Sequence, residues 1–420
     1  MFSRSVSFVN AGVVADGGLA SSIRFSGRVL AIDEPPARGD EVVDLEGSFV
    51  LPGLVNAHDH LELNHFGRVK FRSSYENASD WIDDMRPNLR EDSRIREARA
   101  HRLSHRLLIG GIKNLLAGVA TVSHHNPFYR GLRRRFPVRV VRRYGWAHSF
   151  FLEGEPVGAG GERGREVTRA YRATKATAPF LVHLAEGVDR RARQELSRLE
   201  ELGCLGENTV LVHGVGVSCE EWTYARSRGA GLVWCPSSNL FLLGQTAAVR
   251  EFLHCAPASR DWIALGTDSR LSGSRDLLDE IREARRISNL AAAELLRMVT
   301  TNAARLLRLP AAGRLARGLP ADLLVIPRLA SDPADALLAA RRDQVQLVAL
   351  GGRPAIAAPQ LSKVFAARRV RTESVKLDGK DRILARRLAR AIRSCPILEP
   401  GLELEEARSL TAMATTARPR

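Results

Sequence analysis

The chain has 420 residues, of which 45% are hydrophobic, and 63 Lys+Arg against 47 Asp+Glu give a formal net charge of +16. This length can hold one large α/β barrel plus a smaller module, and no apolar run reaches the ~18 residues that a membrane-spanning helix needs. The basic residues are mostly Arg, are spread along the chain and have few aromatic neighbours, so we do not expect nucleic acid as a partner.

Short strand-like runs fill residues 1–50, separated by turn-forming Gly and Pro pairs. The chain begins directly with these runs and its five cysteines show no C-x-x-C spacing, so we expect a cytoplasmic protein without a disulfide framework. Because residues 1–50 are too few to build a core alone, they need a partner. Similar runs at Ala321–Ile326 and Val345–Leu350 predict a composite β-sandwich, formed from residues 1–50 and 309–360.

Between these two ends, strand-like runs alternate with helix-like stretches, which is the pattern of β/α units. Seven strands are clear, and one of them starts at Val138 and runs toward Trp146. The stretch 126–179 is short for the usual two units, so the fourth strand is not located. We therefore predict an α/β fold: a (β/α)₈ TIM-like barrel over residues 51–308, which this short stretch would compress around strands 3 and 4.

The stretch Leu51–Glu62 ends its apolar run in His58 and His60. Successive side chains on a strand alternate between faces, so both imidazoles point to the same side. Two imidazoles so placed can hold one metal ion, although two surface histidines alone would give the same pattern. His183, His213 and Asp268 also follow predicted strands, at the end where such barrels carry their chemistry. Together these positions favour a metal site.

The ordered motifs of the chain resemble the amidohydrolase superfamily from about residue 7 to about residue 357. The resemblance is carried by Leu51–His60, Gly118–Val122, His183–Glu186, His213–Val215, Cys235–Leu240, Leu265–Ser269, Met298–Ala304 and Gly313–Asp322. Within the superfamily the chain is most similar to the mononuclear branch of deaminases and chlorohydrolases. Binuclear members carry a carboxylated lysine on the fourth strand, whereas Lys175, the nearest candidate, lies in a predicted helix.

This resemblance implies one divalent metal ion, Zn²⁺ or Fe²⁺, held by His58, His60, His183 and Asp268. A metal-activated hydroxide would then hydrolyse a carbon–nitrogen bond other than a peptide bond. Asp268 would accept the proton of the water, Glu186 would carry a proton to the substrate, and His213 would stabilise the tetrahedral centre. The expected reaction is deamination of a small N-heterocycle; ring opening of a cyclic amide and a catalytically inactive barrel scaffold are the alternatives.

The sequence indicates the substrate-binding residues less clearly than the metal ligands. Leu63 stands where guanine deaminases carry a substrate-reading Gln, and His125 and His148 follow the second and third strands, where they could line the pocket or lie on its rim. Arg133-Arg134-Arg135 with Arg139, Arg142 and Arg143 could hold an anionic substrate, but a solvated face is the simpler interpretation.

Residues 361–420 fall outside the resemblance. Ile383, Leu384, Leu388 and Ile392 have helical spacing among arginines, which predicts a basic helix packed on the barrel or on a second subunit. A homodimer is therefore left open. The chain ends in an Ala/Thr/Arg tail of low complexity, which we expect to be disordered.

Overall fold

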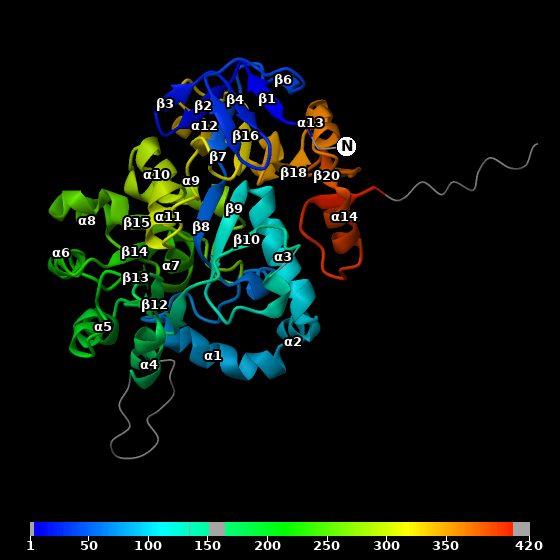
Figure 1. The fold of residues 1–420 in the computed structure, drawn as a ribbon. Coiled ribbons are helices and arrows are strands. Elements are labelled where there is room, and N and C mark those ends of the chain that lie inside the picture. Colours follow the sequence, from blue (N-terminus) through cyan, green and yellow to red (C-terminus); the bar gives the residue numbers. More distant parts are fainter. Residues whose placement is uncertain (1–3, 134, 151–163, 406–420) are drawn as a thin grey trace, which may run out of the picture.

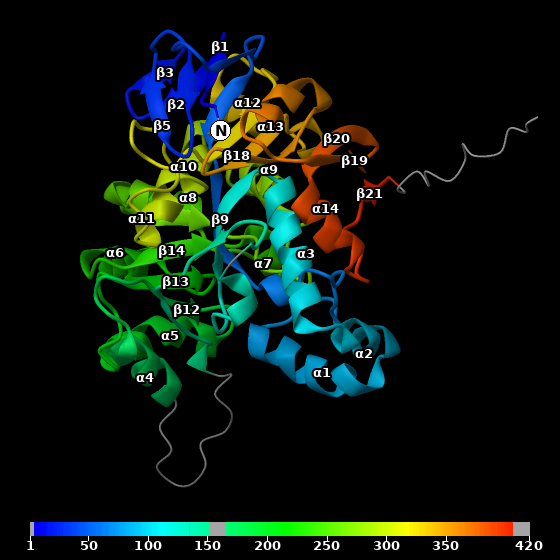
Figure 2. The ribbon, with the colours of Figure 1, turned by 45° about the vertical axis from the view of Figure 1, so that its right-hand side comes forward.

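A barrel of parallel strands lies below a β-sandwich made from both ends of the chain (Figures 1 and 2). The computed structural model describes residues 4–133, 135–150 and 164–405. Blue N-terminal strands and yellow to orange C-terminal strands lie together at the top of both views. Both the predicted barrel and the predicted composite sandwich are confirmed. Within the described ranges, no helix combines the length and apolarity required to span a bilayer.

Two parallel sheets form the barrel wall, in the orders β10-β9-β8 and β11-β12-β13-β14-β15. The strands are β8 (Leu54–Asp59), β9 (Val119–His124), β10 (Arg139–Val140), β11 (Gly145–Ala147), β12 (Phe180–Leu184), β13 (Thr209–His213), β14 (Gly231–Trp234) and β15 (Ile263–Leu265). Every residue of β8, β9, β12 and β13 is buried, as expected for parallel strands covered on both faces. The Asp268 N–H donates to the His58 carbonyl (3.1 Å), which joins the far edge of the second sheet to β8.

Helices surround this wall, and α1 and α2 lie at the end of the barrel far from the sandwich in both views. The helices from the first to the last barrel unit are α1 (Ala78–Glu91), α2 (Ser93–Ala100), α3 (Leu103–Leu116), α4 (Arg165–Ala173), α5 (Arg190–Glu201), α6 (Cys219–Ser227), α7 (Pro236–Leu243), α8 (Val249–Cys255), α9 (Leu277–Ser288), α10 (Ala292–Met298) and α11 (Thr301–Leu306). Gly110 lets α3 approach the turn after β8, because a Cβ there would lie 2.2 Å from the Leu61 carbonyl oxygen.

One extended segment fills the third and fourth strand positions. β10 pairs with β9 and β11 pairs with β12, while only residues 141–144 separate β10 from β11. No helix lies in this described link, so the predicted compression around strands 3 and 4 is confirmed. The fourth strand, which the sequence did not reveal, is Gly145–Ala147, and it contains no lysine. Lys175 lies after α4 rather than within it.

The sandwich packs a sheet of order β5-β4-β1-β6 against a longer sheet of order β21-β19-β20-β18-β17-β16-β7-β2-β3. The strands from the N-terminal part are β1 (Val6–Val9), β2 (Gly12–Ala15), β3 (Gly18–Ala20), β4 (Ile23–Phe25), β5 (Val29–Ile32), β6 (Glu41–Asp44) and β7 (Phe49–Pro52). Those from the C-terminal part are β16 (Leu323–Ile326), β17 (Leu347–Leu350), β18 (Arg353–Ala357), β19 (Thr372–Leu377), β20 (Lys380–Ala385) and β21 (Leu402–Leu404), with helices α12 (Pro333–Ala339), α13 (Ser362–Ala367) and α14 (Arg386–Arg393). β7 pairs with β16, so the two chain ends share one sheet.

The structure corrects the predicted boundary at residue 360, because the longer sheet continues beyond it. β20 pairs with β18, β19 with β20, and β21 with β19. Ile383 and Leu384 therefore belong to a strand, and the basic helix begins only at Arg386. The edge of β18 offers backbone groups that β20 satisfies, and this long-range pairing overrides the helical spacing. The predicted disordered tail falls largely on residues 406–420, which lie outside the described part of the chain.

Candidate metal centre

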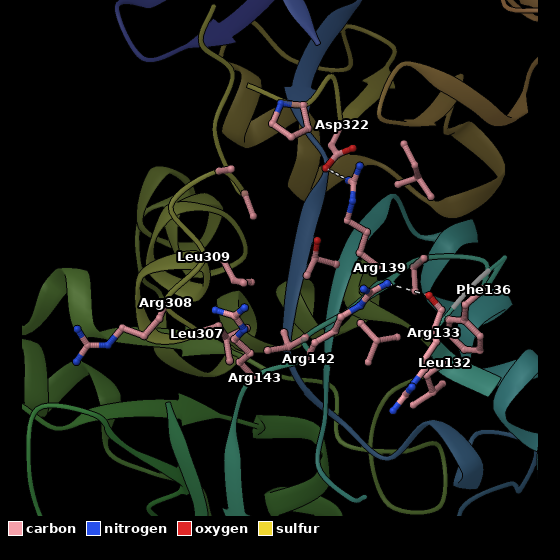
Figure 3. A pocket seen from close by; sticks show the side chains of 18 of the residues that line it. Leu132, Arg133, Phe136, Arg139, Arg142, Arg143, Leu307, Arg308, Leu309 and Asp322 are labelled. Carbon is pink, nitrogen blue, oxygen red and sulfur yellow. Dashed lines mark hydrogen bonds and ion pairs between the residues drawn. The ribbon is translucent and has the colours of Figure 1, made fainter. Parts of the chain in front are cut away.

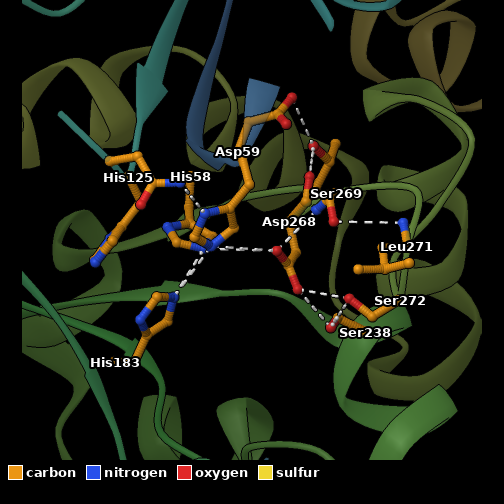
Figure 4. Close-up of polar contacts among 12 residues, drawn as sticks. His58, Asp59, His125, His183, Ser238, Asp268, Ser269, Leu271 and Ser272 are labelled. Carbon is orange, nitrogen blue, oxygen red and sulfur yellow. Dashed lines mark hydrogen bonds and ion pairs between the residues drawn. The ribbon is translucent and has the colours of Figure 1, made fainter. Parts of the chain in front are cut away.

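Side chains from four barrel strands converge at the carboxyl end of the barrel (Figure 4). His58 lies on β8 and His60 directly after it, while His183 lies on β12. His213 ends β13, and Asp268 stands three residues beyond β15. The structure thus brings together all four proposed metal ligands and His213.

The donor atoms of this cluster have the separations of ligands around one ion. The Nε2 atom of His183 lies 3.4 Å from the Nε2 atoms of both His58 and His60. The Oδ1 atom of Asp268 lies 3.6 Å from His60 Nε2 and 3.9 Å from His58 Nε2. Nitrogen and oxygen ligands about 2.0–2.2 Å from a tetrahedral ion are roughly 3.3–3.6 Å apart. The residues present therefore fit a single divalent cation.

The protonation states also suit a metal. Burial, followed by neighbouring imidazoles, lowers the pKa of His58 and of His183 well below the ordinary value, so both rings are neutral, as ligands must be. Burial alone would raise the pKa of Asp268. The imidazoles of His60 and His213 and hydroxyls of two serines outweigh it, so the pKa of this carboxyl lies below its ordinary value. Neutral imidazoles and one carboxylate are a donor set for Zn²⁺ or Fe²⁺.

Two serines fix the orientation of the Asp268 carboxylate. Ser238 and Ser272 each donate a hydroxyl hydrogen bond of 2.7 Å to Oδ2. Oδ1 accepts the Ser269 N–H (2.8 Å) and faces the imidazoles. The carboxylate therefore presents one defined oxygen to the cluster, as Figure 4 shows.

Glu186 stands beside the cluster, three residues after His183. Its Oε1 atom lies 3.6 Å from His213 Nε2. His213 Nδ1 donates to the Asn239 amide oxygen (2.7 Å), so its Nε2 carries the lone pair that faces Glu186. Burial raises the pKa of Glu186 to about 7. The charge of His213 lowers this pKa, and the charge of Asp268 raises it. A carboxyl with such a pKa can hold and release a proton near neutral pH.

Strained backbone marks the same strand ends. Ala185, His213 and Asp268 have φ values of 51°, 76° and 50°, in the left-handed region that non-glycine residues rarely adopt. Each such residue costs of order 1–3 kcal/mol unless its surroundings hold it. Gly266 allows the required close approach of β15 to β8, because a Cβ there would lie 2.6 Å from the Cβ of His58.

The sequence interpretation missed a buried ion pair behind the ligands. Asp59, between His58 and His60, lies 3.3 Å from the Nζ atom of Lys113, and both side chains are 0% exposed. Asn64 and Asn114 donate to Asp59 at 2.7 and 2.8 Å, and Lys113 donates to Asn64 and Thr267 at 2.7 and 3.0 Å. This network ties the turn after β8 to the loop that carries Asp268. A lysine inside the apolar run of α3 was the available signal.

The three residues predicted to read the substrate separate into two groups. The His125 ring lies 4.1 Å from the His183 ring between centroids, and the His148 ring stacks on His183 at 6.1 Å. Donor atoms of these three histidines also lie within 4.8 Å of one another. Leu63 instead packs against a separate apolar cluster that includes Phe66. The substrate-binding roles of all three remain predictions.

Comparisons with known proteins give a family match and a set of deaminase relatives. The family described as "Amidohydrolase family" matches residues 178–355. A 5-methylthioadenosine/S-adenosylhomocysteine deaminase from Natronomonas pharaonis is 28% identical over 347 residues, covering 72% of this chain and 78% of the relative. A deaminase of the same name from Halobacterium salinarum is 27% identical over 363 residues, covering 74% and 80%.

Two solved structures share the fold. An adenosine deaminase from Xanthomonas campestris with bound zinc has a TM-score of 0.66 at 19% identity, over 87% of this chain and 97% of that one. An atrazine chlorohydrolase from Arthrobacter aurescens complexed with zinc has a TM-score of 0.67 at 17% identity, over 87% and 99%. The ordered motifs, the family match over residues 178–355 and the shared fold thus agree that the chain is similar to amidohydrolases, with deaminases among its relatives and a deaminase and a chlorohydrolase among its structural neighbours.

Proposed function

We propose that this protein is a metal-dependent aminohydrolase that removes an exocyclic amino group from an N-heterocyclic small molecule. The observation that carries the proposal is Glu186, a carboxyl with a pKa of about 7 placed 3.6 Å from His213 at the edge of the imidazole cluster. The deaminase relatives support the reaction class. Their names direct the first substrates to test, which are 5-methylthioadenosine and S-adenosylhomocysteine.

His58, His60, His183 and Asp268 would hold one divalent ion, Zn²⁺ or Fe²⁺. When bound, such an ion supplies Lewis-acid activation of a water molecule. Asp268 keeps its carboxylate ionised, because its pKa is held below the ordinary value, and this carboxylate, whose Oδ1 faces the imidazoles, can accept a proton. His213 is oriented by the hydrogen bond from its Nδ1 to Asn239, and its Nε2, which faces Glu186, would stabilise the tetrahedral centre.

Glu186 would act as the proton carrier. In its protonated form it can deliver a proton to a ring nitrogen or to the departing amine, and in its ionised form it can take one up again. Its side chain is 13% exposed, so bulk water competes weakly for that proton. His125 and His148, which border His183, would line the substrate side of the cluster, and Leu63 stays a candidate of the same kind.

The decisive assay measures ammonia release from purines, pyrimidines, pterins and hydantoins, beginning with the two adenosine derivatives. Release of ammonia with the ring intact supports the aminohydrolase. Ring opening without ammonia would replace the proposal with a cyclic amide hydrolase, and a fully loaded protein that turns over none of these compounds would favour an inactive scaffold.

The metal content is tested separately by elemental analysis of the purified protein. We expect about one equivalent of zinc or iron per chain, since three imidazoles and one carboxylate can hold such an ion and leave a position for water. A content below about a tenth of an equivalent, together with activity that chelators leave unchanged, would refute the metal. A cytoplasmic location, a homodimer and the absence of a nucleic-acid partner are further proposals from the sequence, and light scattering of the purified protein tests the dimer.

A further inference from the structure

A cavity of about 980 Å³ lies between the barrel and the β-sandwich, at the other end of the strands from the metal centre (Figure 3). Thr121 of β9 lines the cavity. It lies four residues before His125, which borders the imidazole cluster, and four residues span roughly 13 Å along a strand. The segment 138–143, which carries β10, forms another part of the wall. In the described chain this segment runs into β11 without a helix, so the outer side of the barrel stays accessible here.

The cavity is strongly basic. Eight of its lining residues are arginines, and Asp322 is the only acid among them. That acid is already engaged, because it forms an ion pair with Arg139 and accepts the Gly351 N–H (2.6 Å). The charge of the lining therefore exceeds what its own acid can neutralise. Within the ranges that the structure describes, the guanidinium groups of Arg133, Arg143 and Arg353 form no hydrogen bond or ion pair.

Like charges also crowd the side of the cavity next to α14. Burial, followed by the guanidinium groups of Arg353 and Arg135, lowers the pKa of Arg387. Three cations held this close repel one another, and an anion between them would relieve the repulsion. Figure 3 shows Arg139, Arg142 and Arg143 around the opening, whereas Arg308 extends away from it and donates to the Glu207 carbonyl.

The remaining surface of the cavity is apolar. Phe136 and Leu309 are partly exposed within it. Val141 and Leu307 lie deeper, where they join the apolar cluster that fills the barrel. A simple inorganic anion would leave this floor uncovered, and an uncharged apolar ligand would leave the arginines without a counter-charge. The lining therefore suits a ligand that has both an anionic group and a ring.

We propose that this cavity binds a nucleotide, that is, a phosphorylated small molecule with an aromatic ring. Guanidinium groups bind phosphate oxygens through paired hydrogen bonds and stack on planar rings. The volume lies within the roughly 300–1,000 Å³ of small-molecule sites. Because the cavity is separate from the metal centre, this ligand is not the substrate of the proposed deamination, and the inference does not rest on that function.

Isothermal titration calorimetry of the full chain with ATP, ADP and inorganic triphosphate tests the proposal. We expect one ATP per chain, an affinity that falls with added salt, and binding of triphosphate about tenfold or more weaker, because it lacks the stacking ring. Arg143→Ala/Arg353→Ala should weaken ATP binding at least about tenfold. The matched control is Arg165→Ala/Arg169→Ala on α4, which removes the same charge at two exposed residues outside the cavity and should change affinity less than about twofold.

Several results would overturn the proposal. These are no ATP binding, equal losses in both double variants, triphosphate bound as tightly as ATP, or a single-stranded RNA that binds more tightly and depends on the same two arginines. Thermal melting without ligand shows whether the variants fold, and Arg133→Ala provides a second test should the double variant not fold. ATP binding should persist in protein stripped of metal by a chelator, so that failure of the proposed deamination and failure of this inference remain distinguishable.

Discussion

The two ends of the barrel hold charge in different ways. At the carboxyl end, most of the imidazoles and carboxylates and Lys113 are buried, and hydrogen-bond partners orient several of them, such as the serines on Asp268 and Asn239 on His213. At the amino end, the cavity arginines are exposed, and three of them have no partner in the described structure. Burial fixes both the geometry and the pKa of a group, whereas an exposed guanidinium keeps its charge available for a ligand. Chemistry is therefore expected at the first end and binding at the second.

The largest effect is expected from Glu186→Gln at the carboxyl end. The substitution keeps the size of the side chain but removes its titrating proton, and general acid–base catalysis contributes about 10²- to 10⁴-fold. We expect kcat to fall by that factor while the metal content stays at the wild-type value. The two are measured on the same samples, with kcat taken on whichever substrate the ammonia screen finds.

Asp268→Asn is the matched variant, because it changes a proposed ligand rather than the proton carrier. It should lower metal retention as well as turnover, since the site loses its charged ligand. If Glu186→Gln turns over within about threefold of wild type, the carboxyl is not the proton carrier and the mechanism is wrong.

The next largest effect is expected on stability, from a buried charge that the C-terminal segment supplies near the carboxyl end of the barrel. Glu399 is 0% exposed and lies 2.7 Å from guanidinium nitrogens of both Arg270 and Arg342, and Arg270 follows Asp268 by two residues. Glu399→Gln should reduce the free energy of unfolding by about 3–5 kcal/mol, because Arg270 stays buried without its counter-charge, whereas Arg342 keeps its ion pair with Asp378. Urea unfolding measures this change.

An exposed ion pair gives the control for that experiment. Asp83 and Arg86 are 63% and 58% exposed in their side chains, so Asp83→Asn should cost less than about 1 kcal/mol. Equal losses in the two variants would mean that burial does not set the contribution of these charges.

A smaller effect should depend on pH. Burial raises the pKa of Glu195 from 4.5 to about 8, against the hydrogen bond from the Ala185 N–H. The folded state thus holds this proton more tightly than the unfolded state, so the stabilisation is complete below pH ~4.5 and is lost as pH rises toward ~8. Glu195→Gln removes this dependence.

The melting temperature, measured at pH ~5 and pH ~8, should drop more in the wild type than in Glu195→Gln. Other buried carboxyls, including Glu280 with its pKa of about 7, titrate in both proteins. The difference between the two drops therefore isolates Glu195. Identical drops would show that this carboxyl is not protonated in the fold.

The smallest effect is expected at the amino end. Arg139, 43% exposed in its side chain, pairs with Asp322, and Arg139→Ala should change the free energy of unfolding by less than about 1 kcal/mol. A loss above about 2 kcal/mol in urea unfolding would show that the arginine lining is structural and would weaken the contrast between the two ends.

The sequence by itself determined the barrel, its composite sandwich and the cluster of proposed ligands. Strand periodicity sets the faces of His58 and His60, and the alternation of β and α segments puts His183, His213 and Asp268 at the same ends of their strands. Glu186 follows from its spacing to His183. These inferences use only the periodicity, order and spacing of residues along the chain, so they can be made without knowledge of long-range contacts.

Other features were decided by the tertiary structure alone. The strand Gly145–Ala147 has three residues, too few for a periodic signal, and is defined by its pairing with β12. Ile383 and Leu384 fit helical spacing, yet pairing with β18 makes them strand. The Asp59–Lys113 pair and the arginine cavity join residues that lie far apart in sequence. Such contacts depend on how distant segments pack. They cannot be predicted from a single sequence, because burial and the charge of a partner are properties of a residue's folded surroundings and not of the residue itself.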